Sequence, residues 1–375
     1  MKVLQVLPAM QGGGVERGTI EIASALKNNN IENIVVSGSG RLVADLQKIG
    51  VKHIDLPVGS KNPLKWLKNI RTLRKIIKEE DVSIVHARSR IPAWICYFAL
   101  KKCPDVKFLT TFHGRYGTKP KWFKIPYNRI MVAGDLVISI SNFISEHIKE
   151  TYHVASDKIR LIYRGADMNK FDPVLVSSTQ IEDLTKQWQV PTDKPVILMP
   201  GRLSRMKGHL VVLEALSLMK HKEVTCVFVG SAHGKADYQK ELKQKIDALS
   251  EKTSILLMPH CSQMPTAYMI SDVVISASLY PEAFGRTITE AQSMERIVIA
   301  TAHGGAMETI KDGKTGYLVP VGDPKALAEA LDRVLDMSIA QREEMGKAAA
   351  ASVAENFSIY QMCEKTLAVY EELSK

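Results

Sequence analysis

Two basic and two acidic side chains stand at spacings that could hold a phosphorylated ligand. Arg202 and Lys207 lie in the segment PGRLSRMKGH, directly after an apolar run. A guanidinium grips a phosphate bidentately, an ammonium adds a point charge, and glycines let the backbone approach closely. Further along, Glu282 and Glu290 belong to the segment SLYPEAFGRTITEA. Their carboxylates could accept hydrogen bonds from sugar and ribose hydroxyls.

A third segment, PAMQGGGVERG, begins at Pro8 and contains three consecutive glycines, Gly12 to Gly14. Glycines before a helix start favour close contact with an anion, although a tight turn explains them equally well. The pattern is not the dinucleotide fingerprint G-x-G-x-x-G, because Arg17 stands at the last glycine position. No acidic residue ends the second expected strand either, so a dinucleotide site is weakly supported.

Short apolar strands alternate with helical patterns, and these elements must position the motifs. In the first half the expected strands are Val3–Leu7, Ile34–Val36, Ile54–Leu56, Ser83–Val85, Phe108–Thr111 and Leu136–Ile140. In the second half they are Val196–Pro200, Val224–Gly230, Ser254–Met258, Val273–Ser276, Ile297–Ala300 and Gly316–Val319. Such alternation is typical of parallel sheets covered on both faces. We therefore predict an α/β protein with two doubly wound, Rossmann-like sheets.

The expected domains are residues 1–170 and 195–355, joined by a linker over residues 171–194. They are followed by a helix over residues 356–375, which we expect to pack back on the first domain. A chain of 375 residues is long for a single core, which favours two domains. The apolar runs fall short of the ~20 residues of a membrane span. Five cysteines without a C-x-x-C pair indicate neither a disulfide framework nor a zinc site, so we expect a cytoplasmic protein.

These motifs together resemble the retaining glycosyltransferases of family 4, which have the two-domain GT-B fold. The resemblance rests on G-R-x(4)-K-G from Gly201 and P-E-A-F-G-x(4)-E-A from Pro281. Further matching segments are the glycine-rich first loop, Phe112-His113-Gly114, Val137 to Ser141, Arg164 to Asp167, and Gly304 to Glu308. Many relatives have Asn-Gly-Val-Asp where this chain has Arg-Gly-Ala-Asp, so a role for Arg164 is not implied.

The resemblance implies a nucleotide-sugar donor site in the second domain, opposite an acceptor-binding first domain across a cleft. Arg202 and Lys207 would hold the diphosphate, Glu290 the ribose and Glu282 the transferred sugar. His113 of the first domain would point at the sugar. The catalytic residues implied are therefore His113, Glu282, Arg202 and Lys207. The remaining donor-binding residues implied are Gly13, Gly14, His260, Phe284, Gly285 and Arg286.

A metal ion is the other common way to hold a diphosphate. No two aspartates of this chain stand two positions apart, so the D-x-D pattern of metal-dependent glycosyltransferases is absent. We expect transfer without a metal or other cofactor. The resemblance further implies retention of configuration through a front-face ion pair. The choice between UDP and GDP, the sugar and the oligomeric state stay open.

Basic residues concentrate in one part of the chain, which suggests the kind of acceptor. Residues 61–130 contain 17 Lys and Arg against 4 Asp and Glu, whereas the whole chain has a net charge of +10. From Lys61 to Lys78, lysines recur on one side of an expected helix, and leucines and isoleucines stripe another: Leu64, Leu67, Ile70, Leu73 and Ile77. That pattern fits a helix packed on a sheet, or a face resting on anionic lipid.

A second basic stretch, Arg115 to Arg129, interleaves aromatic residues with cations. Our hypothesis is peripheral binding to the inner face of a bacterial membrane, near a glycan or lipid-linked acceptor of lipopolysaccharide or cell-envelope synthesis. The acceptor or membrane candidates are Lys65, Lys68, Arg88, Arg115, Lys121 and Trp122. Aromatic residues among cations could also stack nucleic-acid bases, but nothing else in the sequence indicates nucleic-acid binding. The alternatives are an epimerase or phosphorylase of the same fold, or an inactive lipid- or nucleic-acid-binding protein.

Overall fold

The computed structural model describes residues 1–232, 236–249 and 253–375, and the chain divides into two compact units. Unit 1 comprises Met1–Tyr163 together with Tyr360–Lys375, and unit 2 comprises Arg164–Ile359. The last helix of the chain, expected over residues 356–375, is α15 (Ile359–Ser374) and lies almost entirely in unit 1.

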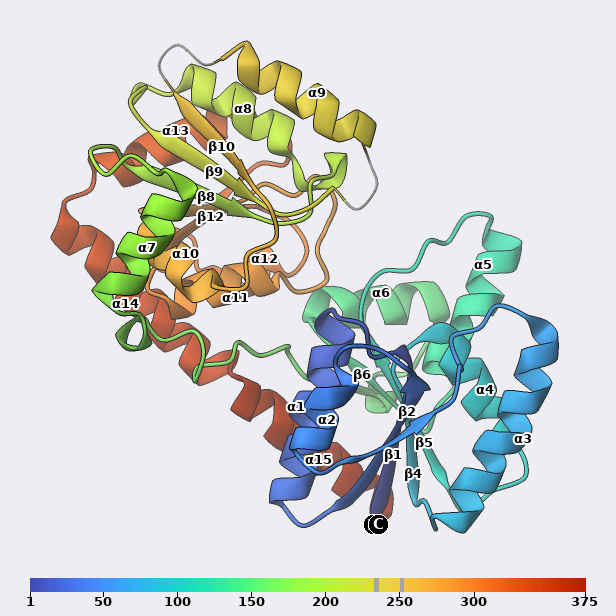
Figure 1. The fold of residues 1–375 in the computed structure, drawn as a ribbon. Helices are drawn as coiled ribbons and strands as arrows, with labels where there is room; N and C mark the ends of the chain where they lie inside the picture. The colour runs from blue at the N-terminus through green and yellow to red at the C-terminus, as the bar shows by residue number, and fades with distance from the viewer. Residues whose placement is uncertain (233–235, 250–252) are drawn as a thin grey trace. The chain divides into compact units, whose positions relative to one another are not determined.

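Unit 1 is built on a seven-stranded parallel sheet in the order β3-β2-β1-β4-β5-β6-β7 (Figure 1). Its strands are β1 (Lys2–Ala9), β2 (Glu32–Gly38), β3 (Lys52–Asp55), β4 (Ile84–Ala87), β5 (Lys107–Phe112), β6 (Leu136–Ser139) and β7 (Ile159–Leu161). Its helices are α1 (Gly14–Asn28), α2 (Val43–Lys48), α3 (Pro63–Glu79), α4 (Arg90–Leu100), α5 (Lys121–Asn128), α6 (Asn142–Tyr152) and α15. Each predicted strand of the first half is present, which confirms the alternating pattern.

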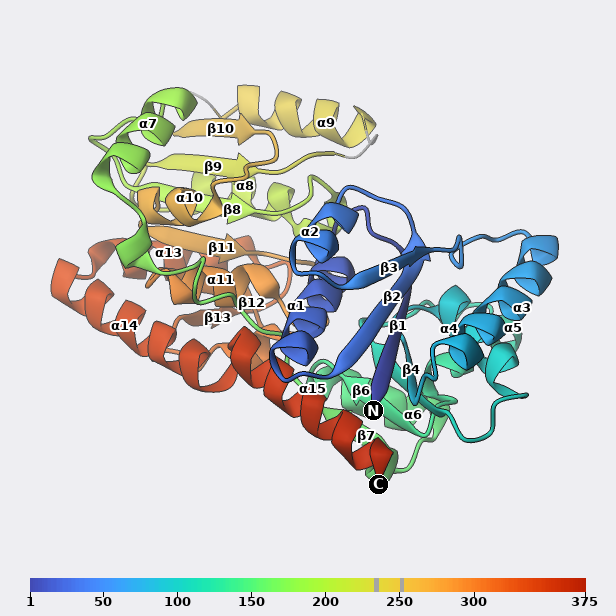
Figure 2. The ribbon, with the colours of Figure 1, turned by 60° about the horizontal axis from the view of Figure 1, so that its bottom comes forward.

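Unit 2 contains a six-stranded parallel sheet in the order β10-β9-β8-β11-β12-β13 (Figure 2). Its strands are β8 (Val196–Pro200), β9 (Thr225–Val229), β10 (Ser254–Met258), β11 (Val273–Ser276), β12 (Ile297–Thr301) and β13 (Tyr317–Val319). Its helices are α7 (Ser178–Trp188), α8 (His209–Leu218), α9 (Ala236–Asp247), α10 (Met264–Ile270), α11 (Arg286–Ser293), α12 (Ala306–Thr309), α13 (Pro324–Asp336) and α14 (Ile339–Asn356). The second doubly wound sheet is thus confirmed.

The strand β8 shows why apolar runs form the centre of this sheet. All five of its residues are buried, and neighbouring side chains point to opposite faces. Ile197 and Met199 join one apolar cluster, whereas Val196 and Leu198 join another. Helices therefore cover both faces, as expected for a continuous apolar strand.

Residues 171–194, expected to form a linker, are built into unit 2. Helix α7 begins with a capping box in which Ser177 and Gln180 exchange hydrogen bonds. Its Leu184 and Trp188 are buried in the same apolar cluster as Val196. The segment therefore contributes to the core of unit 2 through the apolar face of α7. Few apolar residues mark that face in the sequence, so the segment resembled a linker.

Candidate functional site

The segments with Arg202 and Glu282 follow adjacent strands of unit 2. Strands β8 and β11 are neighbours, and the strand order runs outward in opposite directions from them. Loops at the carboxyl ends of two such strands flank the crevice in which open α/β sheets bind ligands. The topology therefore brings the two conspicuous motifs of the second half to one edge of one sheet.

The loop after β8 is held by backbone contacts. Gly201 N donates to the Val229 carbonyl at 2.8 Å, and Leu279 N donates to the Met206 carbonyl at 2.7 Å. Gly208 has a φ of 80°, and a Cβ there would lie 2.0 Å from the Ala277 oxygen. Only glycine fits this close approach between the two loops.

Lys207 and Glu282 form an ion pair that joins these loops. Lys207 Nζ lies 2.5 Å from Glu282 Oε1, and Ser278 Oγ donates to the same oxygen at 2.5 Å. Burial alone would raise the pKa of Glu282, but the charge and hydrogen bond of Lys207 hold it below its ordinary value. His303 Nε2 lies 2.7 Å from the Ser278 carbonyl, which can only accept, so His303 donates there.

Arg202 differs from the other cations of its loop. Its side chain is exposed and forms no hydrogen bond or ion pair within the described part of the chain. Arg205, by contrast, pairs with Glu241 at 2.5 Å and lies over the ring of Tyr238. Of the two arginines, Arg202 is thus the one whose charge is available to an anion.

Glu290 lies on α11, the helix that begins directly after Gly285. The hydroxyl of Tyr268 donates to Glu290 Oε2 at 3.4 Å, and Arg286 lies 3.6 Å from Oε1. Burial and then the Glu290 carboxylate raise the pKa of Tyr268 well above its ordinary value. Tyr268 therefore stays a neutral donor that orients this carboxylate.

Two further predicted donor residues of unit 2 differ in exposure. His260 follows β10 and is exposed, so its side chain is accessible. Phe284 is 3% exposed and packs edge-to-face on Phe357 at 5.8 Å between centroids. The ring of Phe284 therefore belongs to the core beneath the loop, and a part of this residue in donor binding stays a prediction.

Unit 1 contains the remaining predicted donor and catalytic residues. Gly13 has a φ of 147° and precedes α1, which begins at Gly14. A side chain at Gly13 would approach Glu16 Oε2 to 2.8 Å, so glycine suits this turn. His113 follows the end of β5 and is half-buried. The parts of Gly13, Gly14 and His113 in catalysis stay predictions.

The candidates for an acceptor or membrane surface fall into two groups. Those with exposed side chains are Lys65, Lys68, Arg115, Lys121 and Trp122. Arg88 is 3% exposed and donates to Gln5 Oε1 at 2.6 Å inside unit 1. Arg88, directly after β4, is therefore too buried to face a membrane, and its part in acceptor binding stays a prediction.

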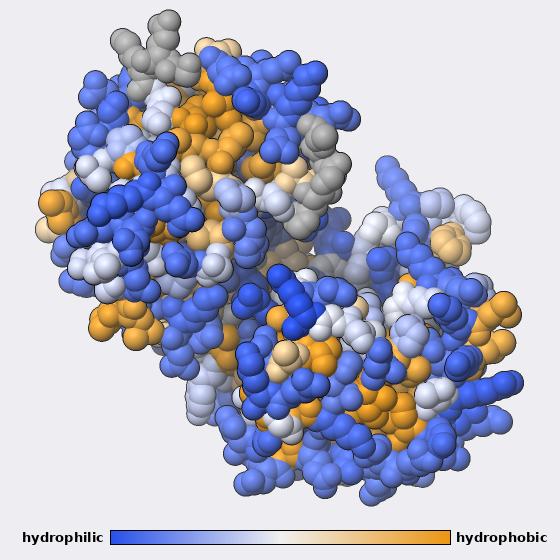
Figure 3. All heavy atoms as spheres, viewed as in Figure 1, coloured by the Kyte–Doolittle hydropathy of each residue, from blue (hydrophilic) through white to orange (hydrophobic). Residues whose placement is uncertain are grey.

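The apolar stripe expected on the Lys61–Lys78 helix is only partly buried. In α3, Leu73 and Ile77 are buried as predicted. Leu64 and Leu67, in contrast, are 77% and 58% exposed. Trp122 and Phe123 of α5 are likewise 81% and 50% exposed. Figures 1 and 2 place α3 and α5 on the same side of unit 1, and Figure 3 shows hydrophobic among hydrophilic side chains there.

Sequence reasoning missed three residues that hold the carboxylates. Ser278 and His303 support Glu282, and Tyr268 supports Glu290. Ser278 could have been noticed, because it opens the same loop as Glu282. No local signal marks His303, which follows β12, or Tyr268, which lies on α10, because their contacts join elements that are separate in the sequence.

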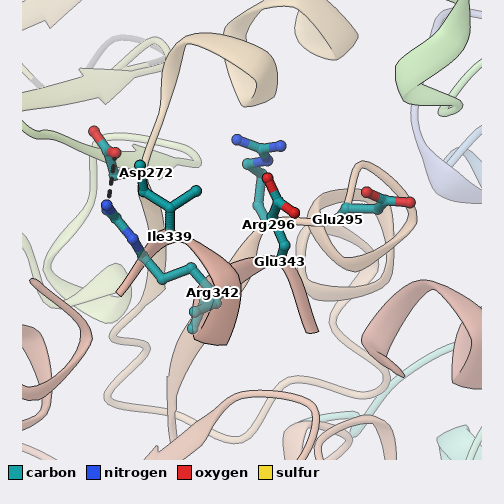
Figure 4. Close-up of a pocket in the computed structure, with 7 residues that line it drawn as sticks. Asp272, Glu295, Arg296, Ile339, Arg342 and Glu343 are labelled. Atoms are coloured by element: carbon teal, nitrogen blue, oxygen red, sulfur yellow. Dashed lines mark hydrogen bonds and ion pairs between the residues drawn. The ribbon is translucent and has the colours of Figure 1, made fainter. Parts of the chain in front are cut away.

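A separate hollow of about 290 Å³ lies at the opposite edge of the unit 2 sheet (Figure 4). Its lining includes Asp272 and Ile297, which stand at the amino ends of β11 and β12. Arg342 pairs with Asp272 there at 3.1 Å, and Arg296 donates to backbone carbonyls. None of the predicted site residues lines this hollow.

Two properties of the described residues concern metal ions and membranes. The described residues include no group of three or more His, Cys, Asp or Glu side chains placed to hold a metal ion. Among those residues there is also no helix with the length and apolarity needed to cross a membrane.

Comparison with known proteins gives two family matches that together span most of the chain. Residues 12–170 match the model described as Glycosyltransferase Family 4, and residues 180–352 match Glycosyl transferases group 1. A glycosyltransferase from Rickettsia africae ESF-5 is 42% identical, with a TM-score of 0.92, and the match covers 100% of this chain and 98% of that one.

Two more distant structures share the fold. Anabaena HepE, solved with UDP and glucose, is 22% identical over 99% of both chains, with a TM-score of 0.83. WaaG, a glycosyltransferase involved in lipopolysaccharide biosynthesis, is 17% identical with a TM-score of 0.76, over 98% of this chain and 99% of that one.

Proposed function

We propose, from the premise that the chain belongs to the family 4 glycosyltransferases and has their GT-B fold, that it moves a sugar from a UDP- or GDP-sugar to a glycan or lipid-linked acceptor. The observation that carries this proposal is the exposed Arg202 in the loop of Lys207, which pairs with Glu282 of the neighbouring loop at the switch point of the unit 2 sheet. Cations for a diphosphate and a carboxylate for hydroxyls lie together there. HepE, which was solved with UDP and glucose, supports a nucleotide-sugar donor.

In this proposal the residues of unit 2 divide the donor between them. Arg202 and Lys207 hold the diphosphate, which gains negative charge as the bond to the sugar breaks. Fixed cations stabilise that charge more in the transition state than in the ground state. Glu282 accepts from hydroxyls of the sugar, and Glu290 accepts from those of the ribose. His113 contacts the sugar from unit 1.

Transfer in this proposal retains the anomeric configuration and needs no metal. The acceptor attacks the face from which the diphosphate leaves, and the departing diphosphate takes its proton. Two cationic side chains in the loop after β8 do the work that a metal ion does elsewhere. Activity that survives EDTA supports this proposal, whereas activity lost to EDTA and restored by Mn²⁺ or Mg²⁺ contradicts it.

The experiment that tests the function is a panel of UDP- and GDP-sugars with the purified protein. Thermal shifts identify the nucleotide sugars that bind, and release of the nucleoside diphosphate in the presence of acceptor extracts measures transfer. NMR of the product gives the anomeric configuration. Interconversion of the nucleotide sugar without release would instead indicate an epimerase, and the absence of both reactions would contradict an enzymatic function.

The second part of the proposal is that the protein reaches its acceptor at a membrane surface. The exposed apolar side chains of α3 and α5 stand among lysines, a combination that binds the headgroup region of anionic lipid. We therefore place the protein at the cytoplasmic face of the membrane, in the synthesis of lipopolysaccharide or another envelope glycan. The structural likeness to WaaG supports this place.

Vesicle binding tests that surface directly. Sedimentation with phosphatidylglycerol vesicles should be strong at low salt and weaken as salt screens the lysines. Trp122→Ala and Leu64→Gln should each reduce binding. Ile339→Gln, which alters a 68% exposed isoleucine of unit 2, is the matched control and should change nothing. Equal loss in all three variants, or no binding by the unaltered protein, would contradict the proposal.

A further inference from the structure

The ion pair between Lys207 and Glu282 couples the two halves of the proposed donor site. One of its partners is assigned to the diphosphate and the other to the sugar, so the inference below rests on the proposed function. The side chains of Lys207 and Glu282 are 27% and 25% exposed, so both remain accessible to a ligand. A diphosphate that takes Lys207 must therefore separate it from Glu282.

The backbone holds both partners in place, so the pair is preset by the fold. The stem of Lys207 packs along Gly201, where a Cβ would lie 3.6 Å from Lys207 Cε. On the other side, Gly305 N donates to the Glu282 carbonyl at 2.9 Å. We therefore treat the two loops as fixed, so that only the side chains of Lys207 and Glu282 exchange partners. Exchange of partners then depends on which ligand groups replace the lost contacts.

The two oxygens of Glu282 are used unequally. Oε1 accepts both from Lys207 and from Ser278, whereas Oε2 accepts no hydrogen bond within the described part of the chain. If Lys207 turns to a phosphate, Glu282 keeps only the hydroxyl of Ser278. A partly buried carboxylate without its cation is costly unless other donors replace the cation.

The two natural ligands differ in what they offer Glu282. A nucleotide sugar brings hydroxyls that donate to Oε1 and Oε2, so it compensates for the loss of Lys207. A free nucleoside diphosphate brings no such donor, and its terminal phosphate adds a further negative charge near the carboxylate. The Lys207–Glu282 pair thus weakens the binding of the free nucleoside diphosphate more than the binding of the nucleotide sugar.

We propose that the Lys207–Glu282 pair makes the site discriminate the sugar-bearing donor from the free nucleoside diphosphate, and so favours product release after transfer. Glu282 is in this view a specificity-determining residue as well as a contact to the sugar. Its removal frees Lys207 for the phosphates. The affinity for the free nucleoside diphosphate should therefore rise, although the substitution deletes the contact that the proposed function assigns to the sugar.

Isothermal titration with UDP, UDP-glucose, GDP and GDP-mannose tests the inference. Glu282→Ala and Glu282→Gln should each bind the free nucleoside diphosphate at least about tenfold more tightly than the unaltered protein. The preference for the sugar nucleotide should shrink by a similar factor. The glutamine variant keeps the shape of the side chain, and thermal unfolding verifies that both variants are folded.

Glu241→Ala is the matched control. It also removes one carboxylate, but that carboxylate pairs with Arg205, which stands in the same loop as Lys207. It should leave nucleotide affinity unchanged. Unchanged or weaker UDP and GDP binding in both Glu282 variants would overturn the inference, as would an equal gain in Glu241→Ala. If sugar transfer persists in that case, the proposed function stands without the inference. If the unaltered protein binds no nucleotide and transfers no sugar, both fall.

Discussion

Replacing Arg202 with alanine should separate catalysis from stability. The guanidinium is exposed and forms no hydrogen bond or ion pair with the described residues, so its loss removes no polar interaction from that part of the folded protein. We expect the free energy of unfolding to change by less than about 0.5 kcal/mol. A donor aimed at the charge that develops in a transition state is worth roughly 10²–10³ in rate, or about 2.7–4 kcal/mol. The rate of transfer should fall by that factor.

The assay is nucleotide release at saturating acceptor, with denaturant unfolding measured on the same preparations. Arg205→Ala is the control: it removes the same charge three positions away, but from a pair with Glu241 at the surface. Its transfer rate should stay within about twofold of the unaltered protein, because Arg205 is already paired with Glu241 and is not assigned to the donor. Arg202→Lys should be intermediate, since lysine keeps the charge and loses the bidentate grip. Equal rates for the two alanine variants would refute the reasoning.

Three further predictions concern stability and can be checked by denaturant unfolding. Tyr370→Phe should cost about 1–3 kcal/mol, because it leaves His86 Nδ1 without the hydroxyl that lies 2.7 Å away in the core; an unchanged midpoint would contradict this. Asp332→Ala should cost about 1–3 kcal/mol, because its buried carboxylate accepts from the backbone of Lys220 and of the following residue. Asp336→Ala, on an exposed side chain of the same helix, should cost less. Burial lowers the pKa of His209 to about 4 from an ordinary 6.5, so the unfolded chain binds the proton first and stability should fall as the pH drops from 6.5 to 4. His209→Gln should flatten that slope by up to about 1.4 kcal/mol per pH unit, and an unaltered slope would exclude His209 as a source.

Local pattern was sufficient for most of the fold. Each strand of the two sheets is a short apolar run between helical segments, and its identity depends on neighbours within a few residues. The positions of Arg202 and Glu282 at strand ends follow from the same reasoning, because parallel strands share one carboxyl edge. What a side chain touches there depends on residues far along the chain. The pairing of Lys207 with Glu282 is therefore not readable from either motif.

The differences from the sequence prediction have the same origin. Phe284 belongs to the motif that begins at Pro281, yet its ring packs on Phe357 at the end of the distant helix α14. Arg88 belongs to the most basic stretch of the chain, and only the sheet register shows that it is covered. In α3 the helical periodicity was predicted correctly, but periodicity does not show how much of the helix packs against the rest of unit 1. Leu64 and Leu67 therefore remain exposed.

The return of α15 to unit 1 sets the order in which the protein can be finished during synthesis. Unit 1 includes Tyr360–Lys375, which follow unit 2 in the sequence. The hydroxyl of Tyr370 lies within hydrogen-bond distance of His86, and Glu372 forms an ion pair with Arg160, so both connect this helix to the sheet. Domains made first on the ribosome usually mature first. Here the central unit is continuous from Arg164 to Ile359 and can close beforehand. All seven strands of the unit 1 sheet are translated before unit 2, but the helix that packs on them follows unit 2, so this sheet stays partly uncovered until unit 2 has been made.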